Sequence, residues 1–198
     1  MFEDRIDAGT QLAEKLHKFK DENVVVLAIP RGGLPIGAII ANALKAPLDV
    51  ALTKKIGHPY HKEYAIGAVS LEDMILTDDK GVTQGYIEEE VALIRKNLKQ
   101  RHNQYYRNRT PEIVTGKTVI IVDDGIATGN TLLATVELIR KLEPKKIIVA
   151  VPVAPNSILP KYESNPNINE VICLLAPHNF QAVGQFYENF EQVSDKEA

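Results

Sequence analysis

The chain has 198 residues, of which 44% are hydrophobic and 25% charged. These values are ordinary for a globular protein, and the length suffices for one domain with a substantial core. Its 23 Lys and Arg against 26 Asp and Glu give a net charge of −3. That balance argues against a dedicated nucleic-acid-binding protein, which usually carries a basic excess.

Cysteine usage and the N-terminal residues narrow the class further. The single Cys173 excludes an internal disulfide and a Cys-rich zinc site. Its apolar neighbours indicate a buried structural thiol. Residues 1–20 are charged throughout and lack the apolar region of a secretory signal. No run approaches the roughly 18 apolar residues of a membrane span. We therefore expect a cytoplasmic protein.

The first third of the chain predicts a helix and then a strand that ends in a glycine loop. Residues 5–20 carry apolar side chains at helical spacing, typical of an amphipathic helix on a sheet. Residues 24–29 are a continuous apolar run, which indicates a buried strand. Pro30-Arg31-Gly32-Gly33 follows, and residues 34–44 are then helical. No Lys-Ser or Lys-Thr follows, so this is not a Walker loop. It is either a tight turn with a surface arginine or a site for an anion at a strand end.

The middle of the chain predicts a strand, a hairpin and a long helix. Residues 48–53 read as a strand that leads to Lys54 and Lys55, which are either solvated or directed at an anion. Residues 66–69 and 74–77 favour a hairpin, and a helix is expected from about residue 85 to 106. The two histidines of residues 58–64 lack a third ligand at metal spacing, so we interpret that segment as a polar loop. The basic and aromatic residues 101–109 suit either nucleic acid or a polyphosphate.

Residues 119–131 carry the most specific pattern. An apolar run, 119–122, ends in Asp123 and Asp124, and a small-residue turn then opens a helix. Backbone N–H groups at a helix start bind phosphate, and Gly129 allows a close backbone approach. Carboxylates beside that site would accept hydrogen bonds from sugar hydroxyls or hold Mg²⁺ through water. An ordinary strand-to-helix turn would not explain two adjacent acids, because like charges repel.

The last third adds strands over residues 145–151 and 170–175, with a short helix over 156–164 between them. Strands that alternate with helices predict an α/β fold in which a parallel sheet is flanked by helices on both faces.

Residues 119–131 also resemble a known signature. Four apolar residues, Asp-Asp, three variable residues and Thr-Gly-x-Thr are similar to the motif by which type I phosphoribosyltransferases bind 5-phosphoribosyl-1-pyrophosphate (PRPP). The resemblance implies a single domain over 1–198. Its core would span about 22–155, its helical insertion about 85–107, and a small hood would come from the N- and C-terminal segments.

The implied activity is transfer of the 5-phosphoribosyl group from Mg-PRPP to an acceptor, expected to be a nucleobase, with release of pyrophosphate. The alternative is a non-catalytic regulatory protein that senses PRPP or a nucleotide on the same fold. The implied partners are PRPP and a small-molecule acceptor, without nucleic acid or membrane, and a homodimer stays open. The chain most resembles bacterial members whose acceptor is unassigned.

The resemblance also implies roles for individual residues. Asp123 and Asp124 would hold the ribose hydroxyls and, through water, Mg²⁺. In this family the first glycine loop often contains a cis peptide that does not precede proline, which we expect at Pro30–Arg31. The residues implied for catalysis are Arg31, Lys55, Asp123 and Asp124; for pyrophosphate, Arg31, Gly32, Gly33 and Lys55; and for the 5′-phosphate, Ala127, Thr128, Gly129, Asn130 and Thr131.

The acceptor side is less defined. In the resembled family the acceptor stacks on the hood, for which we predict Val153, Phe180 and Tyr187. Hypoxanthine-guanine and xanthine-guanine enzymes carry an aspartate at the position of Ala127, where it interacts with purine N7. The alanine argues against a simple assignment to those enzymes.

Overall fold

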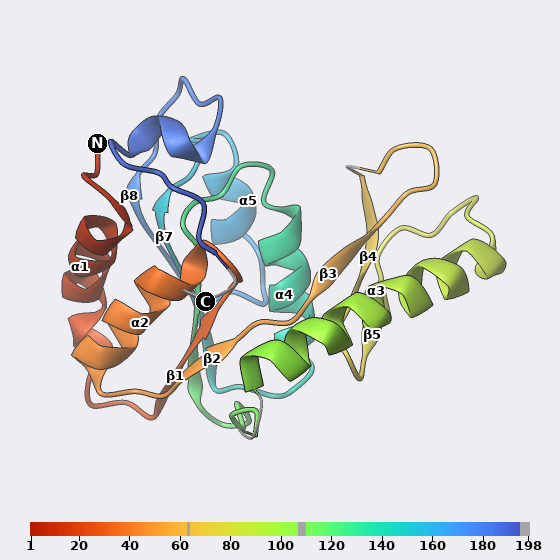
Figure 1. Cartoon of the computed structure of the whole chain (residues 1–198), viewed down its shortest axis with the longest axis horizontal. Helices are drawn as coiled ribbons and strands as arrows, with labels where there is room; N and C mark the ends of the chain where they lie inside the picture. The colour runs from red at the N-terminus through yellow and green to blue at the C-terminus, as the bar shows by residue number, and fades with distance from the viewer. Residues whose placement is uncertain (63, 107–109, 195–198) are drawn as a thin grey trace.

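A five-stranded parallel sheet forms the centre of the molecule. The computed structural model describes residues 1–62, 64–106 and 110–194. The strands lie in the order β2-β1-β6-β7-β8, and every neighbouring pair is parallel (Figure 1). The predicted parallel α/β fold is therefore confirmed. The strands are β1 (Val24–Ala28), β2 (Leu48–Val50), β6 (Thr118–Val122), β7 (Lys146–Val153) and β8 (Glu170–Leu175).

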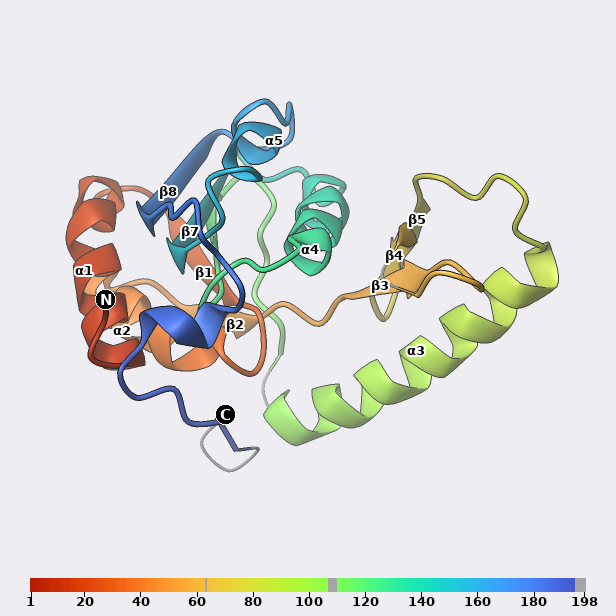
Figure 2. The ribbon, with the colours of Figure 1, turned by 90° about the horizontal axis from the view of Figure 1, so that it is seen from above.

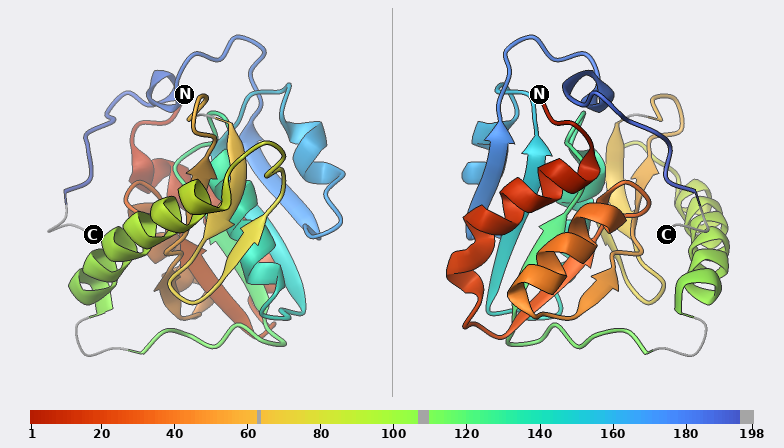
Figure 3. Two further views of the ribbon diagram at one scale, coloured as in Figure 1. Left: turned by 90° about the vertical axis from the view of Figure 1, so that its right-hand side faces the viewer. Right: turned by 60° about the vertical axis from the view of Figure 1, so that its left-hand side comes forward.

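Helices cover both faces of this sheet (Figure 3). On one face lie α1 (Arg5–Leu16) and α2 (Gly33–Leu44), and on the other α4 (Asn130–Arg140) and α5 (Leu159–Glu163). All five residues of β1 and of β6 are buried, which explains their continuous apolar sequences. Their side chains alternate between the two apolar clusters of the core, as successive strand residues must.

The register of β1 and β6 fixes where a ligand would bind. Val24 pairs with Thr118 and Ala28 with Val122, so the carboxyl ends of the two strands are level. The chain order of the sheet reverses between these strands, because β2 lies on one side of β1 and β6 on the other. In open α/β sheets such a switch point leaves a crevice at the carboxyl ends, where ligands bind.

The middle of the chain forms an arm that extends from the sheet (Figures 1 and 2). We use this name for the antiparallel strands β3 (Lys54–Gly57), β4 (Ala65–Val69) and β5 (Met74–Leu76) together with α3 (Gln84–Tyr106). The predicted hairpin is present, and α3 begins and ends within a residue of the expected helix. The arm has its own apolar cluster, and it contacts the core through Ala68 of β4 and Ala134 and Leu138 of α4.

Two predicted elements are shorter than expected. The strand predicted over 48–53 ends at Val50, because β2 is an edge strand that pairs with β1 at three positions. After Ala51 donates to the carbonyl of Ala28, the chain crosses to the arm, and Lys54 opens β3. The helix predicted over 156–164 begins only at Leu159, with Pro160 in its first turn.

The two ends of the chain meet in a hood beyond the carboxyl ends of β7 and β8 (Figure 3). Phe2 forms a parallel bridge with Tyr187, and their rings lie 5.4 Å apart. The Phe2 amide donates to the Phe186 carbonyl, at the end of the 3-10 helix η2 (Val183–Phe186). A second 3-10 helix, η1 (His17–Phe19), follows α1. Within the described residues, no helix is both long enough and apolar enough to cross a membrane.

Candidate functional site

The two glycine loops predicted from the sequence touch each other at the carboxyl ends of β1 and β6. The Ile29 amide donates to the Val122 carbonyl at 2.8 Å. A Cβ on Gly33 would lie 2.6 Å from that carbonyl oxygen, and one on Gly32 would lie 2.0 Å from Oδ2 of Asp124. No larger residue fits either position without movement, so glycine is what lets the loops close on each other.

The first loop contains the expected cis peptide between Pro30 and Arg31. A pocket of about 400 Å³ lies beside it. The residues around this pocket come from the loop, the acidic pair and both ends of the chain: Arg5, Arg31, Gly32, Asp124, Phe190, Gln192 and Val193. Two arginines therefore border a space next to the carboxylate of Asp124, which suits an anionic ligand.

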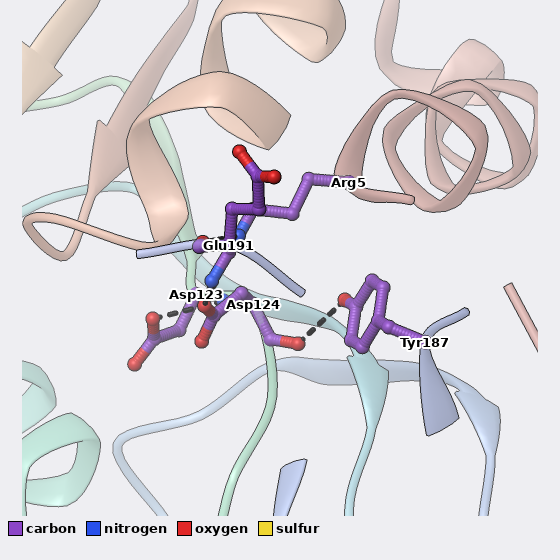
Figure 4. A network of polar contacts seen from close by, with 5 residues as sticks. All are labelled: Arg5, Asp123, Asp124, Tyr187 and Glu191. Atoms are coloured by element: carbon purple, nitrogen blue, oxygen red, sulfur yellow. Dashed lines mark hydrogen bonds and ion pairs between the residues drawn. The ribbon is translucent and has the colours of Figure 1, made fainter. Parts of the chain in front are cut away.

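Asp123 and Asp124 lie directly at the end of β6 (Figure 4). The Asp124 amide donates to Oδ1 of Asp123 at 2.9 Å. Desolvation raises the pKa of Asp123 well above its ordinary range, the charge of Asp124 raises it further, and Arg5 opposes the shift. Adjacent carboxylates at a desolvated strand end carry an electrostatic cost, and such perturbed groups are typical of functional sites.

Arg5 is a site residue that the sequence reasoning missed. Its Nε and Nη2 donate to Oδ2 of Asp124 at 3.0 and 2.8 Å, and the two side chains are only 11% and 15% exposed. The partners are 119 positions apart. Arg5 opens an amphipathic helix that reads as a sheet-packing element, so no local pattern distinguishes it from a surface arginine.

The second loop leads into α4 at a helix start, where backbone amides point outward. Gly129 is the N-cap and has a positive φ of 76°, a conformation that favours glycine. The hydroxyl of the buried Tyr162 donates to the Gly129 carbonyl at 2.8 Å, which anchors the loop to the core. Ala127, Thr128 and Thr131 are exposed. This loop therefore presents backbone N–H groups and hydroxyls to solvent beside the acidic pair.

A cavity of about 440 Å³ separates the two loops from the arm. Pro30 and Thr131 border it on one side, and Lys54 and Arg101 on the other. Lys55 is the next residue of β3, and successive strand residues point to opposite faces. Lys54 pairs with Val69, which packs against α3, and Lys55 pairs with Ala68, which packs against α4. Lys54 therefore borders the cavity on the side of α3. Arg101 belongs to the basic segment 101–109, of which residues 107–109 lie outside the described residues.

The three residues predicted for the acceptor belong to one apolar cluster at the hood. Val153 is fully buried, and Phe180 stacks on Phe186 with ring centroids 5.4 Å apart. The hydroxyl of Tyr187 donates to the Asp124 carbonyl at 2.7 Å, so it is directed at the backbone of the acidic pair. The sequence reasoning missed Val183, which packs against Gly125 together with Val153.

The carboxylates of the site suit a magnesium ion that arrives with a phosphate ligand. Within residues 1–62, 64–106 and 110–194, no group of three or more His, Cys, Asp or Glu could form a metal cage. Mg²⁺ usually keeps several waters and is held by one or two carboxylates together with substrate phosphates. Asp123 and Asp124 provide that donor set. Desolvation raises the pKa of the half-buried Cys173 thiol to about 11, as expected for a structural rather than a reactive cysteine.

Comparison with known proteins identifies the family. Residues 2–187 match the family model of the phosphoribosyl transferase domain. A Mycobacterium tuberculosis (strain H37Rv) protein, provisionally named a phosphoribosyl transferase, is 39% identical over 202 residues, which span 100% of this chain and 45% of the relative. The chain thus spans less than half the length of that curated relative.

Two further proteins extend the comparison. The crystal structure of TT1426 from Thermus thermophilus is 36% identical, with a TM-score of 0.91 over 99% of this chain and 94% of that one. The transcriptional regulator GfcR of Methanosarcina mazei is 29% identical over 140 residues, 70% of this chain and 50% of its own. The match over nearly the whole fold, together with the two loops at the switch point, shows that the chain belongs to the phosphoribosyl transferase domain family.

Proposed function

We propose that the chain transfers the 5-phosphoribosyl group from Mg-PRPP to a small-molecule acceptor of the nucleobase type and releases pyrophosphate. One observation carries the proposal. Two loops suited to anions meet at the carboxyl ends of β1 and β6, and the carboxylates of Asp123 and Asp124 lie between them. PRPP matches this arrangement, because its ribose hydroxyls lie between a 5′-phosphate and a pyrophosphate.

Each part of the ligand has a proposed set of partners. The ribose hydroxyls donate to Asp123 and Asp124, and the pyrophosphate lies against Arg31 and the N–H groups of Gly32 and Gly33. The 5′-phosphate lies on the loop at the start of α4, formed by Ala127, Thr128, Gly129, Asn130 and Thr131. Magnesium, when bound with PRPP, adds positive charge to the leaving pyrophosphate, and Asp123 and Asp124 hold it through water.

The reaction requires that PRPP and the acceptor be oriented and that the developing charge be stabilised. It requires no protein nucleophile. The bond between C1 and pyrophosphate breaks while the acceptor forms a bond to C1. Negative charge collects on the departing pyrophosphate, where Arg31 and the loop amides stabilise it. A lysine of β3 would help to stabilise that negative charge. Lys54 borders the cavity between the loops and the arm, which supports it for this role beside Lys55, the residue that the sequence suggested.

The acceptor would lie on the hood side of Asp124. Phe180 and Val183, which are only partly buried, offer an apolar wall there, whereas Val153 is fully buried in the core. Ala127 carries no acid with which to recognise a purine N7. The proposed acceptor therefore stacks on apolar side chains, and its identity is set by groups other than a carboxylate at position 127.

The ribose assignment is tested by thermal denaturation with and without Mg-PRPP. We expect the ligand to raise the melting temperature of the wild type, because a ligand that binds only the folded state stabilises it. Asp124→Asn should abolish that rise, since the amide bonds a hydroxyl more weakly and carries no charge for the metal. Asp21→Asn, at an exposed acid away from the loops, is the control. An undiminished rise in Asp124→Asn would contradict the assignment.

The enzyme activity itself needs pyrophosphate release. A panel of purine, pyrimidine and other nitrogen bases should include one that releases pyrophosphate from Mg-PRPP. The alternative is a regulatory protein that senses PRPP or a nucleotide. The partial similarity to the regulator GfcR is compatible with that function. PRPP binding without release by any base would favour that alternative.

A further inference from the structure

The hood holds Asp124 at two points, one on its backbone and one on its side chain (Figure 4). Tyr187 donates its hydroxyl to the Asp124 carbonyl at 2.7 Å. Arg5 donates from Nε and Nη2 to Oδ2 of the carboxylate at 3.0 and 2.8 Å. A residue expected to bind the substrate is thus oriented by segments from the two ends of the chain.

Arg5 is itself held in place. Its Nη1 donates to the Glu191 carbonyl at 2.7 Å, and its guanidinium carbon lies 4.0 Å from the centroid of the Phe190 ring. The backbone beneath it is also fixed, because the Asp4 carboxylate caps α1 by accepting from the amides of Ile6 and Asp7. Each of the three guanidinium nitrogens therefore has a partner, and the side chain has little freedom to leave Asp124.

This arrangement leaves one side of the carboxylate for another donor. Gly32 packs on Asp124 so closely that a Cβ there would overlap Oδ2. The carboxylate is thus confined between the loop and Arg5. The two hydrogen bonds from Arg5 occupy both lone pairs of Oδ2, whereas Oδ1 can still accept hydrogen bonds. The rigid guanidinium places two donors on Oδ2 and so fixes the position of that oxygen more closely than a lysine ammonium would.

We propose that Arg5 is a positioning residue of the ribose site, which holds Oδ2 of Asp124 so that Oδ1 is presented to a ribose hydroxyl. The proposal rests on the proposed function, since it requires Asp124 to bind the ribose. Two other roles are separable by experiment. Arg5 also borders the pocket beside Arg31, so it could instead contact the anion directly. It could also only join the hood to the core.

The test is a set of dissociation constants measured by calorimetry for ribose 5-phosphate and for inorganic phosphate, which lacks the ribose and its hydroxyls. Arg5→Ala should weaken the binding of ribose 5-phosphate by about tenfold or more, the usual effect of removing a group that orients a ligand-binding side chain. Arg5→Lys should recover little of the loss, because an ammonium lacks the rigid fork that places two donors on Oδ2. Phosphate affinity should be unchanged in both variants, and circular dichroism should show that each is folded.

A double-mutant cycle and a matched control complete the design. In an Asp124→Asn background, Arg5→Ala should cost almost no further affinity, because its effect passes through the carboxylate. Lys18→Ala removes another ion pair at the same end of the chain, with Glu170, and should leave both affinities unchanged.

Three results would overturn the role of Arg5: an unchanged affinity for ribose 5-phosphate, an equal loss for both ligands, or a full rescue by lysine. If Arg5→Ala does not fold, Arg5→Lys and its cycle with Asp124→Asn decide the question. A wild type that binds neither ribose 5-phosphate nor PRPP would contradict the proposed function itself, and the role of Arg5 with it.

Discussion

At the scale of single residues, the site depends on backbone approaches that only glycine permits. Gly32 and Gly33 let one loop touch Asp124 and the end of β6, and Gly129 turns the other loop into α4 with a positive φ. The polar side chains of the site can bind a ligand only because these backbones lie where a Cβ would not fit. The glycines therefore determine the geometry as much as the charged residues determine the chemistry.

Gly129→Ala should destabilise the protein by more than the backbone conformation alone explains. An alanine at positive φ costs on the order of 1 kcal/mol, and its Cβ would also lie 2.4 Å from the Tyr162 hydroxyl. Gly116→Ala is the matched control, because Gly116 has a φ of 71° and a Cβ added there would meet no atom within 4 Å. Urea denaturation of both variants measures the difference. Equal losses in the free energy of unfolding would show that the contact with Tyr162 is not restrictive.

At the scale of elements, strand register decides which side chains reach the site. The level ends of β1 and β6 bring the two loops together, and these strands were predicted because their apolar sequences are continuous. The arm was harder to predict. Its strands are short, and the change from β2 to β3 occurs within residues 50–54, where no glycine or proline marks a break. The face of β3 on which each lysine lies depends on where that strand begins, which the sequence did not indicate.

Lys54→Ala should therefore weaken the binding of Mg-PRPP more than Lys55→Ala does. We expect a loss of about tenfold for Lys54→Ala, or about 1.4 kcal/mol, because Lys54 borders the cavity beside the first loop. Lys55→Ala is a matched control, with the same change in charge one residue away on the same strand. Dissociation constants from calorimetry compare them. A larger loss for Lys55→Ala would restore the interpretation drawn from the sequence.

At the scale of the whole molecule, charged side chains join the strands at the end opposite the site. Glu22, just before β1, accepts from the Thr118 hydroxyl of β6 at 2.6 Å and from the Lys146 ammonium of β7 at 2.9 Å. The hydrogen bond from Thr118, followed by that from Lys146, lowers the pKa of Glu22 below its ordinary value of 4.5. Stability should depend on pH through this group.

Glu22→Gln should cost stability at neutral pH and lose its effect in acid. A carboxylate whose pKa is lowered by folding stabilises the protein above its unfolded-state pKa, and this contribution disappears as the pH falls through the folded-state value. The expected cost near pH 7 is about 1 kcal/mol, since the group is partly exposed. Urea denaturation near pH 7 and near pH 3 measures it, with Glu89→Gln, at an exposed acid of α3, as control. A cost independent of pH would contradict the role of this carboxylate.

The sequence predicted most of the core and part of the site, for a physical reason. The parallel strands, the two loops and the acidic pair are local patterns, because a buried strand and the turn after it are encoded by neighbouring residues. Arg5, Val183 and Tyr162 reach the site only through tertiary packing. Arg5, for example, is separated from Asp124 by 119 positions and has no local signal. Contacts of this kind appear only once the fold is known.

The meeting of Phe2 with Tyr187, and of Arg5 with Glu191, has a consequence for the order in which the protein forms. The contact of Arg5 with Glu191 closes a loop of 186 positions, and that of Phe2 with Tyr187 closes one of nearly the same length. We therefore expect them to form after the sheet has brought the ends together, which lowers the entropic cost of closing so long a loop. Because Arg5 and Tyr187 belong to these segments, we expect Asp124 to gain both contacts only after the sheet has formed.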